Sequence, residues 1–456
     1  MMASGIMSSH FALLHAVTTN DVAKVLELLE DGVNVNTRDA HRQTPLIIAA
    51  EKGHGEIVRH LIQADADPNN YDEDGWTPLI AASKEGHKDI VVLLLKNTAN
   101  HCIPDQRGWT PIVWASYKGF SNVVRELIRY GANPNARLDL GVSALIWAAG
   151  RGHLETVREL IQGGADAHVA DKFGTSALMW ACRKGHIAVV RLLLEAGVDV
   201  NQASSDGVTP LIMSVKGGFE HLLDLLLSQN VVIDHEDNEG RSALSWAAQE
   251  GLSTIGSRLL TKGAFPNMPD CKGDTPLLLA AKEGHSDMVR ILSQYCIDLE
   301  MADAHGNTPL HAAVERGHLD VLQNLLANGA NMETPNKQGE TPLISGVKQN
   351  SVPCVQRLLD RGVDVKAVDN RGDNVLHTAL RRRLVSMCDM LAAHPEYPAL
   401  LRKRNRNFET PLEVDRKNHR MLKDRLMGVG GPSLNAHKND GFSLEMMFCK
   451  LSSWSD

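Results

Sequence analysis

The chain has 456 residues, and its composition, 43% hydrophobic and 22% charged, is that of a folded protein rather than a disordered or fibrous one. Its formal net charge is −8, so no overall positive field would attract nucleic acid or an acidic bilayer. No wholly apolar run exceeds six residues, as in Ile90 to Leu95. A membrane-spanning helix needs roughly 20 such residues, so we expect no membrane span.

One pattern dominates the sequence: a Thr or Ser recurs every 33 residues without insertion. A Leu follows each of them 17 residues later, from Leu61 to Leu358. A Gly follows nine residues later in every unit except the one with Asn350. The recurring residues are Thr44, Thr77, Thr110, Ser143, Ser176, Thr209, Ser242, Thr275, Thr308 and Thr341. This constant spacing indicates a repeated structural unit.

Between units lies a polar turn that carries a Gly two residues before the capping residue, from Gly75 to Gly372 in ten successive units, and we expect a hairpin-like finger there. The Thr or Ser then caps a first helix, which often opens with Pro because the first N–H groups of a helix lack intrahelical partners. The next Gly ends this helix in the left-handed conformation, and a second helix follows, such as 56–63. Most second helices also end at Gly, but Thr98 and Cys296 stand there in two units, where we expect weaker junctions.

A helix pair of this size cannot bury its own apolar face, so neighbouring units must supply the other wall of the core. The sequence therefore predicts an all-α solenoid of about 12 to 13 helix-turn-helix units with hairpin-like fingers. The expected divisions are a disordered start at 1–10, a solenoid at 11–427 with an N-terminal cap at 11–40, regular units to about residue 373 and irregular units at 374–427, and a disordered end at 428–456.

The stretch Gly306-Asn-Thr-Pro-Leu-His-Ala-Ala-Val-Glu-Arg-Gly-His318 closely resembles the ankyrin repeat. That resemblance implies a stack of helix pairs with a binding groove on the side of the first helices, and proteins as the partners.

A narrower resemblance is carried by Ile146-Trp-Ala-Ala-Gly-Arg-Gly-His153 and by residues 82–87, 171–186 and 215–218. These stretches are similar to the N-terminal array of the kinase D-interacting substrate family, also called ankyrin repeat-rich membrane-spanning proteins. This implies a scaffold in neurotrophin-linked or other receptor signalling, with receptor tails or signalling proteins as partners. That family also carries a nucleotide-binding and membrane-spanning segment, but the sequence contains no GxxxxGK[ST] phosphate loop. The departure is consistent with a truncated isoform or a partial gene model.

The seven cysteines are scattered without a CxxC pair, which favours a reducing compartment over a disulfide framework or a zinc site. Residues 1–14 lack the basic and apolar segments of a secretory signal. We therefore expect a cytoplasmic location, with access to the cytosolic face of a membrane through partners.

Four tryptophans and one methionine occupy one position of five successive units, four residues after the capping residue. This tryptophan row comprises Trp114, Trp147, Trp180, Met213 and Trp246. By the ankyrin resemblance the position faces the groove, where large apolar side chains in register would anchor a peptide. The alternative is that the rings pack against one another as the groove floor.

Residues three or four places further along the same helices form the expected rim of the groove. They are Tyr117, Lys118, Arg151, Arg183 and Lys184, with Lys216 on the same edge. Because this edge carries several cations and few acids, we expect an acidic, or mixed acidic and apolar, ligand segment. An ordinary solvated rim is the alternative.

A second basic feature lies between residues 379 and 427, a segment that contains 12 Lys and Arg but only 6 Asp and Glu. Its clusters are Arg381, Arg382, Arg383, Arg402, Lys403, Arg404 and Arg406. Contact with anionic lipid or an acidic partner is one interpretation, a nuclear-import or nucleic-acid patch is another, and a solvated capping repeat is the third.

Catalysis finds no support in the sequence, which contains no HExxH, GxSxG or GxGxxG motif and no metal-spaced Cys/His cluster. Six of the 20 histidines occupy one loop position after the recurring Gly: His54, His87, His153, His186, His285 and His318. We therefore expect a monomeric, non-catalytic scaffold or adaptor that needs no cofactor and no metal. The alternative is a substrate-recruiting subunit of a ubiquitin ligase or another enzyme complex.

Overall fold

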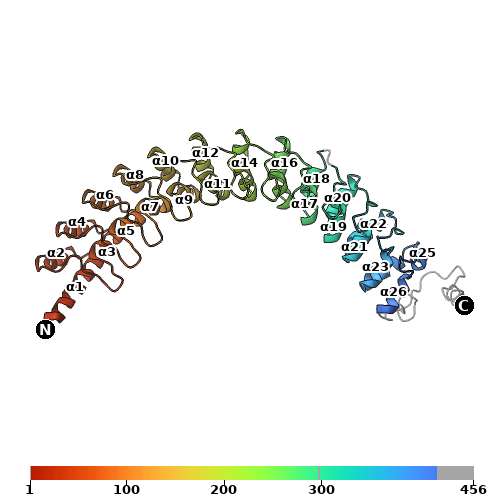
Figure 1. Ribbon diagram of the computed structural model, residues 1–456, viewed down its shortest axis with the longest axis horizontal. Coiled ribbons are helices and arrows are strands. Elements are labelled where there is room, and N and C mark those ends of the chain that lie inside the picture. The colour runs from red at the N-terminus through yellow and green to blue at the C-terminus, as the bar shows by residue number, and fades with distance from the viewer. Residues whose placement is uncertain (1, 296–297, 419–456) are drawn as a thin grey trace. The chain divides into compact units, whose positions relative to one another are not determined.

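The computed structural model describes residues 2–295 and 298–418, and within them it contains 26 α-helices and no β-strand. The helices follow one another as pairs joined by loops (Figure 1). Two isolated antiparallel bridges, Arg137 with Ser143 and Ala170 with Ser176, close the bases of two fingers. The predicted all-α solenoid is confirmed.

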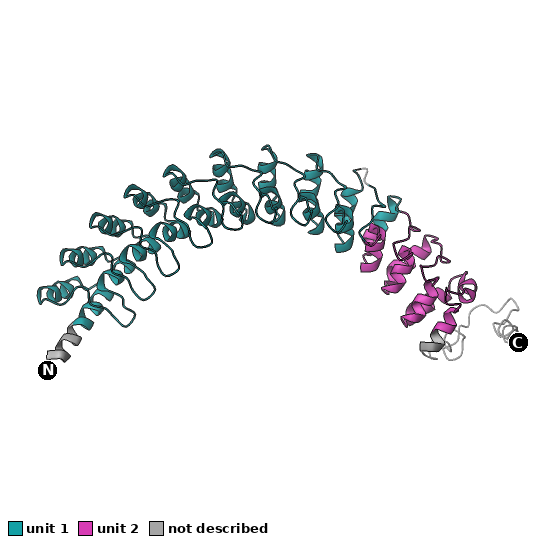
Figure 2. Cartoon of the chain, viewed as in Figure 1, with its two compact units in different colours: residues 1–304, 323–330 teal, residues 305–322, 331–456 magenta. Residues whose placement is uncertain are grey.

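The chain divides into two compact units, residues 1–304 with 323–330 and residues 305–322 with 331–456 (Figure 2). The helices of the first unit are α1 (Met2–Thr18), α2 (Val22–Glu30), α3 (Pro45–Lys52), α4 (Gly55–Gln63), α5 (Pro78–Glu85), α6 (Lys88–Lys96), α7 (Pro111–Lys118), α8 (Ser121–Arg129), α9 (Ala144–Arg151), α10 (Leu154–Gln162), α11 (Ala177–Lys184), α12 (Ile187–Glu195), α13 (Pro210–Lys216), α14 (Glu220–Leu227), α15 (Ala243–Gln249), α16 (Ser253–Thr261), α17 (Pro276–Glu283) and α18 (Ser286–Leu292). The boundary between the units crosses α20 (Leu319–Ala327). The remaining helices, in the second unit, are α19 (Pro309–Arg316), α21 (Pro342–Lys348), α22 (Val352–Asp360), α23 (Val375–Arg381), α24 (Val385–Ala392), α25 (Tyr397–Arg402) and α26 (Pro411–Asn418).

The first helices begin and end where the sequence predicts. The recurring Thr or Ser accepts a hydrogen bond from the backbone N–H three residues on in every regular unit except that of Thr110. The recurring Gly residues, from Gly53 to Gly317, all have φ between 68° and 88°, and Asn350 takes the same conformation at 59°. Both signals therefore act through local backbone chemistry.

At the ends of the second helices, Asp65 and Thr98 adopt left-handed conformations with φ of 64° and 63°. A β-branched residue tolerates this conformation poorly, so Thr98 carries backbone strain. Cys296, the other expected weak junction, lies outside the described residues.

The core of each repeat lies between its first and second helices. In the first compact unit of the chain, for example, α9 packs against α7 and α11 and against its own partner α10. The Leu that follows each capping residue by 17 positions is fully buried at all ten places, which are Leu61, Leu94, Leu127, Leu160, Leu193, Leu226, Leu259, Leu292, Leu325 and Leu358. Each repeat thus contributes one fully buried Leu to the core that it shares with the neighbouring repeat.

Both ends of the chain depart from the regular pattern. We expected disorder over residues 1–10, but α1 already begins at Met2. No proline interrupts this segment, and its continuation is held in the core by Leu13 and Val17, both fully buried. In the second unit the short helix α25 is inserted before the last finger, which accounts for the irregular spacing there. The expected disordered end at 428–456 lies outside the described residues.

Candidate functional site

The tryptophan row lies on five successive first helices of the first unit, α7, α9, α11, α13 and α15. Trp147, Trp180, Met213 and Trp246 are half-buried, and Trp114 is only 9% exposed. The row therefore lies at the surface for most of its length, but its first member belongs largely to the core.

Trp114 is covered by an aromatic cluster that the sequence analysis missed. Trp109 lies 4.5 Å from Trp114 and 5.3 Å from Trp147 between ring centroids, and Trp76 lies 5.8 Å from Trp114. Tyr117, expected on the rim, packs edge-on against Trp147 at 5.2 Å and is half-buried. The available signal was the 33-residue separation of Trp76 and Trp109, each directly before a capping Thr.

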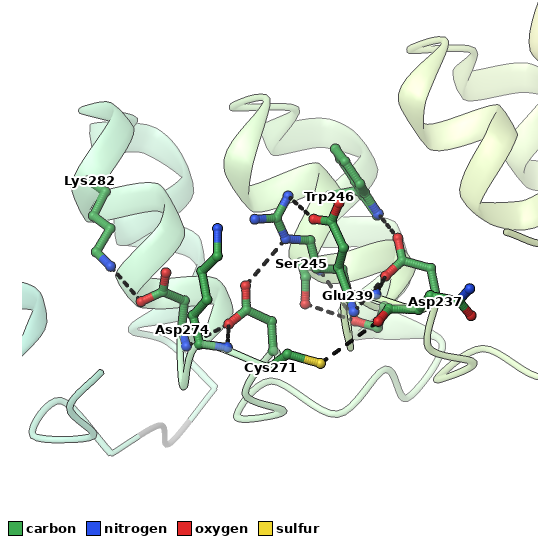
Figure 3. Close-up of polar contacts among 12 residues, drawn as sticks. Asp237, Glu239, Ser245, Trp246, Cys271, Asp274 and Lys282 are labelled. Atoms are coloured by element: carbon green, nitrogen blue, oxygen red, sulfur yellow. Dashed lines mark hydrogen bonds and ion pairs between the residues drawn. The ribbon is translucent and has the colours of Figure 1, made fainter. Parts of the chain in front are cut away.

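Two indoles of the row donate their N–H to a buried carboxylate in the preceding finger. Trp114 Nε1 donates to Asp105 Oδ2 at 2.9 Å, and Trp246 Nε1 donates to Asp237 Oδ2 at 2.8 Å. The second of these bonds is drawn in Figure 3. In both units the aspartate stands five residues before the capping residue, so the same repeat position satisfies both donors.

The other two indoles, Trp147 and Trp180, have buried N–H groups with no acceptor among the described residues. Trp147 lacks one because Leu138 occupies the repeat position of Asp105. Trp180 has Asp171 at that position, but the Asp171 Oδ1 atom accepts from two backbone N–H groups of its own finger and the indole makes no bond to the carboxylate. Orphaned buried donors of this kind are rare in folded proteins.

These two indoles line one mostly apolar pocket of about 260 Å³ between α9 and α11, which we call the indole pocket. Its lining residues are Val142, Ile146, Trp147, Gly150, Arg151, Trp180 and Lys184. The pocket is open because Gly150 has no side chain, whereas the matching positions of the flanking first helices carry Tyr117 and Arg183. A Cβ atom at Gly150 would stand 3.5 Å from Trp180 Cβ, an ordinary contact distance.

Cations flank the tryptophan row along one edge, which we call the cation edge: Lys118, Arg151, Arg183, Lys184 and Lys216. All five are exposed, and none forms an ion pair with a carboxylate among the described residues. Their contacts are instead aromatic, with the Arg151 guanidinium 4.1 Å from the Tyr117 ring centroid and Lys216 Nζ 3.5 Å from that of Trp246. Desolvation of the Lys216 ammonium, which lies over the Trp246 ring, lowers the pKa of Lys216.

Farther along the chain, Lys and Arg side chains form ion pairs with carboxylates of the same chain. Arg241 Nε lies 3.3 Å from Asp270 Oδ2. Lys282 Nζ lies 2.5 Å from Asp274 Oδ1 (Figure 3). In the second unit, Lys348 and Arg381 pair with Glu340 and Asp373 at 2.6 Å and 2.7 Å. Lys282, Lys348 and Arg381 occupy the same repeat position as Arg183 and Lys216, so the sequence pattern alone does not reveal which cations are already paired.

The basic segment of the second unit is not one continuous cationic patch. Arg381 pairs with Asp373, and Arg404 Nη1 lies 3.4 Å from Glu413 Oε2. The backbone N–H of Arg406 donates to the Arg371 carbonyl at 2.9 Å. The side chains expected in this patch are all exposed: Arg381, Arg382, Arg383, Arg402, Lys403, Arg404 and Arg406.

The recurring histidines connect neighbouring units. In His87, His153, His186 and His285, Nε2 lies 2.9 to 3.2 Å from a backbone carbonyl oxygen 36 residues earlier in the chain. His311 Nε2 makes a similar bond to the Glu340 carbonyl at 2.9 Å. Across residues 2–295 and 298–418, no group of three or more His, Cys, Asp or Glu side chains could hold a metal ion.

Comparison with family models identifies the repeated unit. A model of ankyrin repeats in three copies matches residues 65–138, 132–204, 196–270, 253–336 and 316–400, and a model of ankyrin repeats in many copies matches residues 28–82. The chain belongs to the ankyrin-repeat family. Ankyrin repeats generally mediate protein–protein interactions and are typically non-catalytic. No curated protein matches the chain, so the comparisons identify the ankyrin repeat but not the narrower scaffold family.

None of the ankyrin helices in the described parts of the chain has the length and apolar character that crossing a membrane requires.

Proposed function

We propose that this ankyrin protein is a non-catalytic scaffold or adaptor that binds an acidic, partly apolar segment of a partner protein along α7 to α15. The observation that carries the proposal is the combination of a half-buried tryptophan row with five exposed cations that have no carboxylate partner among the described residues. Large aromatic side chains supply binding energy, and unpaired charges supply complementarity and orientation.

The cellular role that we propose is intracellular signalling, with receptor cytoplasmic tails or signalling proteins as partners. Support comes from the sequence stretches similar to the kinase D-interacting substrate family. A cytoplasmic location agrees with the cysteines, since Cys102, Cys182, Cys271 and Cys354 are all free.

The binding surface is tested by presenting the full-length protein to a peptide array in which acidic and apolar positions are varied. The triple variant Lys118→Glu, Lys184→Glu and Lys216→Glu should bind acidic peptides about tenfold more weakly, equivalent to ~1.4 kcal/mol. The matched control is Lys96→Glu with Lys262→Glu, exposed lysines at the ends of the second helices α6 and α16. Equal loss in the variant and the control would contradict the proposal.

The partner class is tested separately, by proximity labelling from the full-length protein and from the same triple Lys→Glu variant, which we call the cation-edge variant. Labelling of receptor-linked signalling proteins that depends on the cation edge supports the scaffold role. Copurification of ubiquitin-ligase subunits would instead favour the substrate-recruiting alternative.

We further propose that the basic segment of the second unit contacts anionic surfaces, because Arg382, Arg383 and Lys403 are exposed. Each cation near an anionic membrane contributes about 1 kcal/mol. The protein should pellet with phosphatidylserine-containing vesicles more than with phosphatidylcholine vesicles, and charge reversal at these three residues should remove the difference. Equal pelleting with both vesicles would overturn the lipid interpretation.

A further inference from the structure

The indole pocket differs from the rest of the tryptophan row in its hydrogen bonding. Trp114 and Trp246 have aspartate acceptors at 2.9 Å and 2.8 Å, whereas the buried N–H groups of Trp147 and Trp180 have none among the described residues. A buried donor left without an acceptor is unfavourable unless something that binds there supplies one. The two orphaned donors occur together, on the two helices that form the pocket.

The size of the pocket suits a single large side chain. Its volume is about 260 Å³. An apolar protein cavity of about 150 Å³ already accommodates benzene, so a phenyl group or a branched aliphatic side chain fits with room for a neighbouring oxygen atom.

The cations that line the pocket and the apolar surface beside it indicate the chemistry of the residues next to the bound side chain. Arg151 and Lys184 line the pocket and have no carboxylate partner among the residues that the structure describes. Two apolar fingertip residues, Leu140 at 54% and Phe173 at 59% exposure, belong to the same two units. The Lys172 N–H donates to the Leu140 carbonyl at 2.9 Å, which joins the two fingertips into one surface.

We propose that the indole pocket is the specificity pocket for an acidic peptide segment of a partner protein, and that it takes one aromatic or branched aliphatic side chain of that segment. A peptide oxygen beside the anchor accepts hydrogen bonds from the Trp147 and Trp180 indoles. An acidic residue next to the anchor pairs with Arg151 and Lys184. This assignment rests on the proposed protein-binding function and adds the chemistry of the anchor residue.

The first test uses sodium 3-phenylpropanoate as the probe, because it carries a phenyl group and a carboxylate. The full-length protein is labelled with ¹⁵N at its tryptophan indoles, and the Nε1–H resonances are assigned with single Trp→Phe variants. We expect the Trp147 and Trp180 resonances to shift during titration, while Trp114 and Trp246 stay nearly unchanged because their donors are already engaged. The neutral analogue 3-phenylpropanamide should bind severalfold more weakly. Equal shifts of all four resonances, or no shift, would overturn the assignment.

The second test closes the pocket from its own wall with Gly150→Leu. Binding of the probe and of acidic peptides with an aromatic anchor should fall at least tenfold. Gly150→Ala is the conservative control, since a single methyl group makes only ordinary contact with Trp180 and should weaken binding much less. Trp147→Phe removes the donor and keeps a ring, so it should weaken probe binding severalfold, whereas Trp76→Phe, which changes a ring outside the tryptophan row, should leave it unchanged.

The outcomes separate this inference from the proposed function. If the cation-edge variant weakens peptide binding but Gly150→Leu and Trp147→Phe do not, the surface binds peptides and the pocket assignment fails. If none of these variants weakens peptide binding, both proposals fail. Should Gly150→Leu unfold, as judged by circular dichroism, the Trp147→Phe and Trp76→Phe pair decides the question alone.

Discussion

A tryptophan at one repeat position serves two different purposes in this chain. Where an aspartate lies within reach, as for Trp114, the indole is satisfied internally and the ring belongs to the packed aromatic cluster. Where no acceptor lies within reach, as for Trp147, the donor is buried without a partner among the described residues, beside a pocket. For Trp114 and Trp147 the difference arises from single residues in the preceding finger, Asp105 and Leu138, rather than from the tryptophans themselves.

The first prediction compares Trp114→Phe with Trp147→Phe. Both changes remove the same ring volume, but only the first leaves the buried Asp105 carboxylate without its indole donor. Trp114→Phe should therefore lower the free energy of unfolding by about 1 to 3 kcal/mol more than Trp147→Phe. Urea unfolding of the two variants measures the difference, and equal losses would show that the Trp114 hydrogen bond contributes nothing measurable.

A second prediction concerns Thr98, which holds a left-handed conformation at φ 63° with its side chain exposed. Replacing it with Gly should raise the free energy of unfolding by about 1 kcal/mol, because glycine adopts this conformation without steric cost. Asp65→Gly is the matched comparison at φ 64°, and it should gain less since aspartate tolerates the left-handed region better. The thermal unfolding midpoints rank the two, and a loss of stability for Thr98→Gly would argue against strain at this junction.

The repeated helix pairs are controlled by short local signals at their ends. The capping hydroxyl, the first-turn proline and the left-handed Gly each satisfy or spare backbone groups that a helix end leaves unpaired. Thr110 is the exception, since its hydroxyl makes no capping bond and α7 begins without one.

This exception gives a prediction about helix caps. Thr77→Ala removes the hydrogen bond from the Ile80 N–H and should lower the free energy of unfolding by ~1 kcal/mol. Thr110→Ala removes no such bond, so its effect should be clearly smaller. Denaturant unfolding of both variants checks the order, and a larger loss for Thr110→Ala would contradict the assignment of the caps.

The fold was predictable because its signals are local and repeat at fixed spacing. The candidate site was only partly predictable. The register of Trp147 and Trp180 is visible in the sequence, but the orphaned indole of Trp180 is not, because Asp171 stands at the position that satisfies other tryptophans and yet makes no bond to this indole. The aromatic residues before the caps were missed because that position holds Thr175 and Arg241 in later units, which hides it from a search for a continuous apolar row.

At the scale of the whole molecule, contacts between neighbouring repeats include buried and half-buried histidines whose surroundings favour the neutral form. Burial lowers the pKa values of His54 and His153 in the first unit and of His377 in the second. The unfolded chain therefore binds more protons than the folded chain when the pH falls below the unfolded histidine pKa of about 6.5. This contribution to stability is present in full above that pH and is lost progressively below it.

We therefore predict that the urea concentration at the unfolding midpoint decreases when the pH is lowered from about 7.5 to about 5.5. His153→Gln should reduce this pH dependence, because its side chain does not titrate. The exposed pair of His41 with Glu73 acts in the opposite direction, since Glu73 raises the pKa of His41, but surface pairs of this kind contribute little. A midpoint that rises on acidification would show that the buried histidines do not dominate.

Among the matching positions of the regular first helices, only the one at Gly150 lacks a side chain. Any glycine codon becomes one for alanine, valine or arginine through a single nucleotide change. Since a Cβ atom there meets only ordinary contacts, a change to alanine would narrow the recess without displacing its neighbours, and the longer side chains would block it. Descendants of this gene could therefore weaken or lose one class of partner through a single nucleotide change.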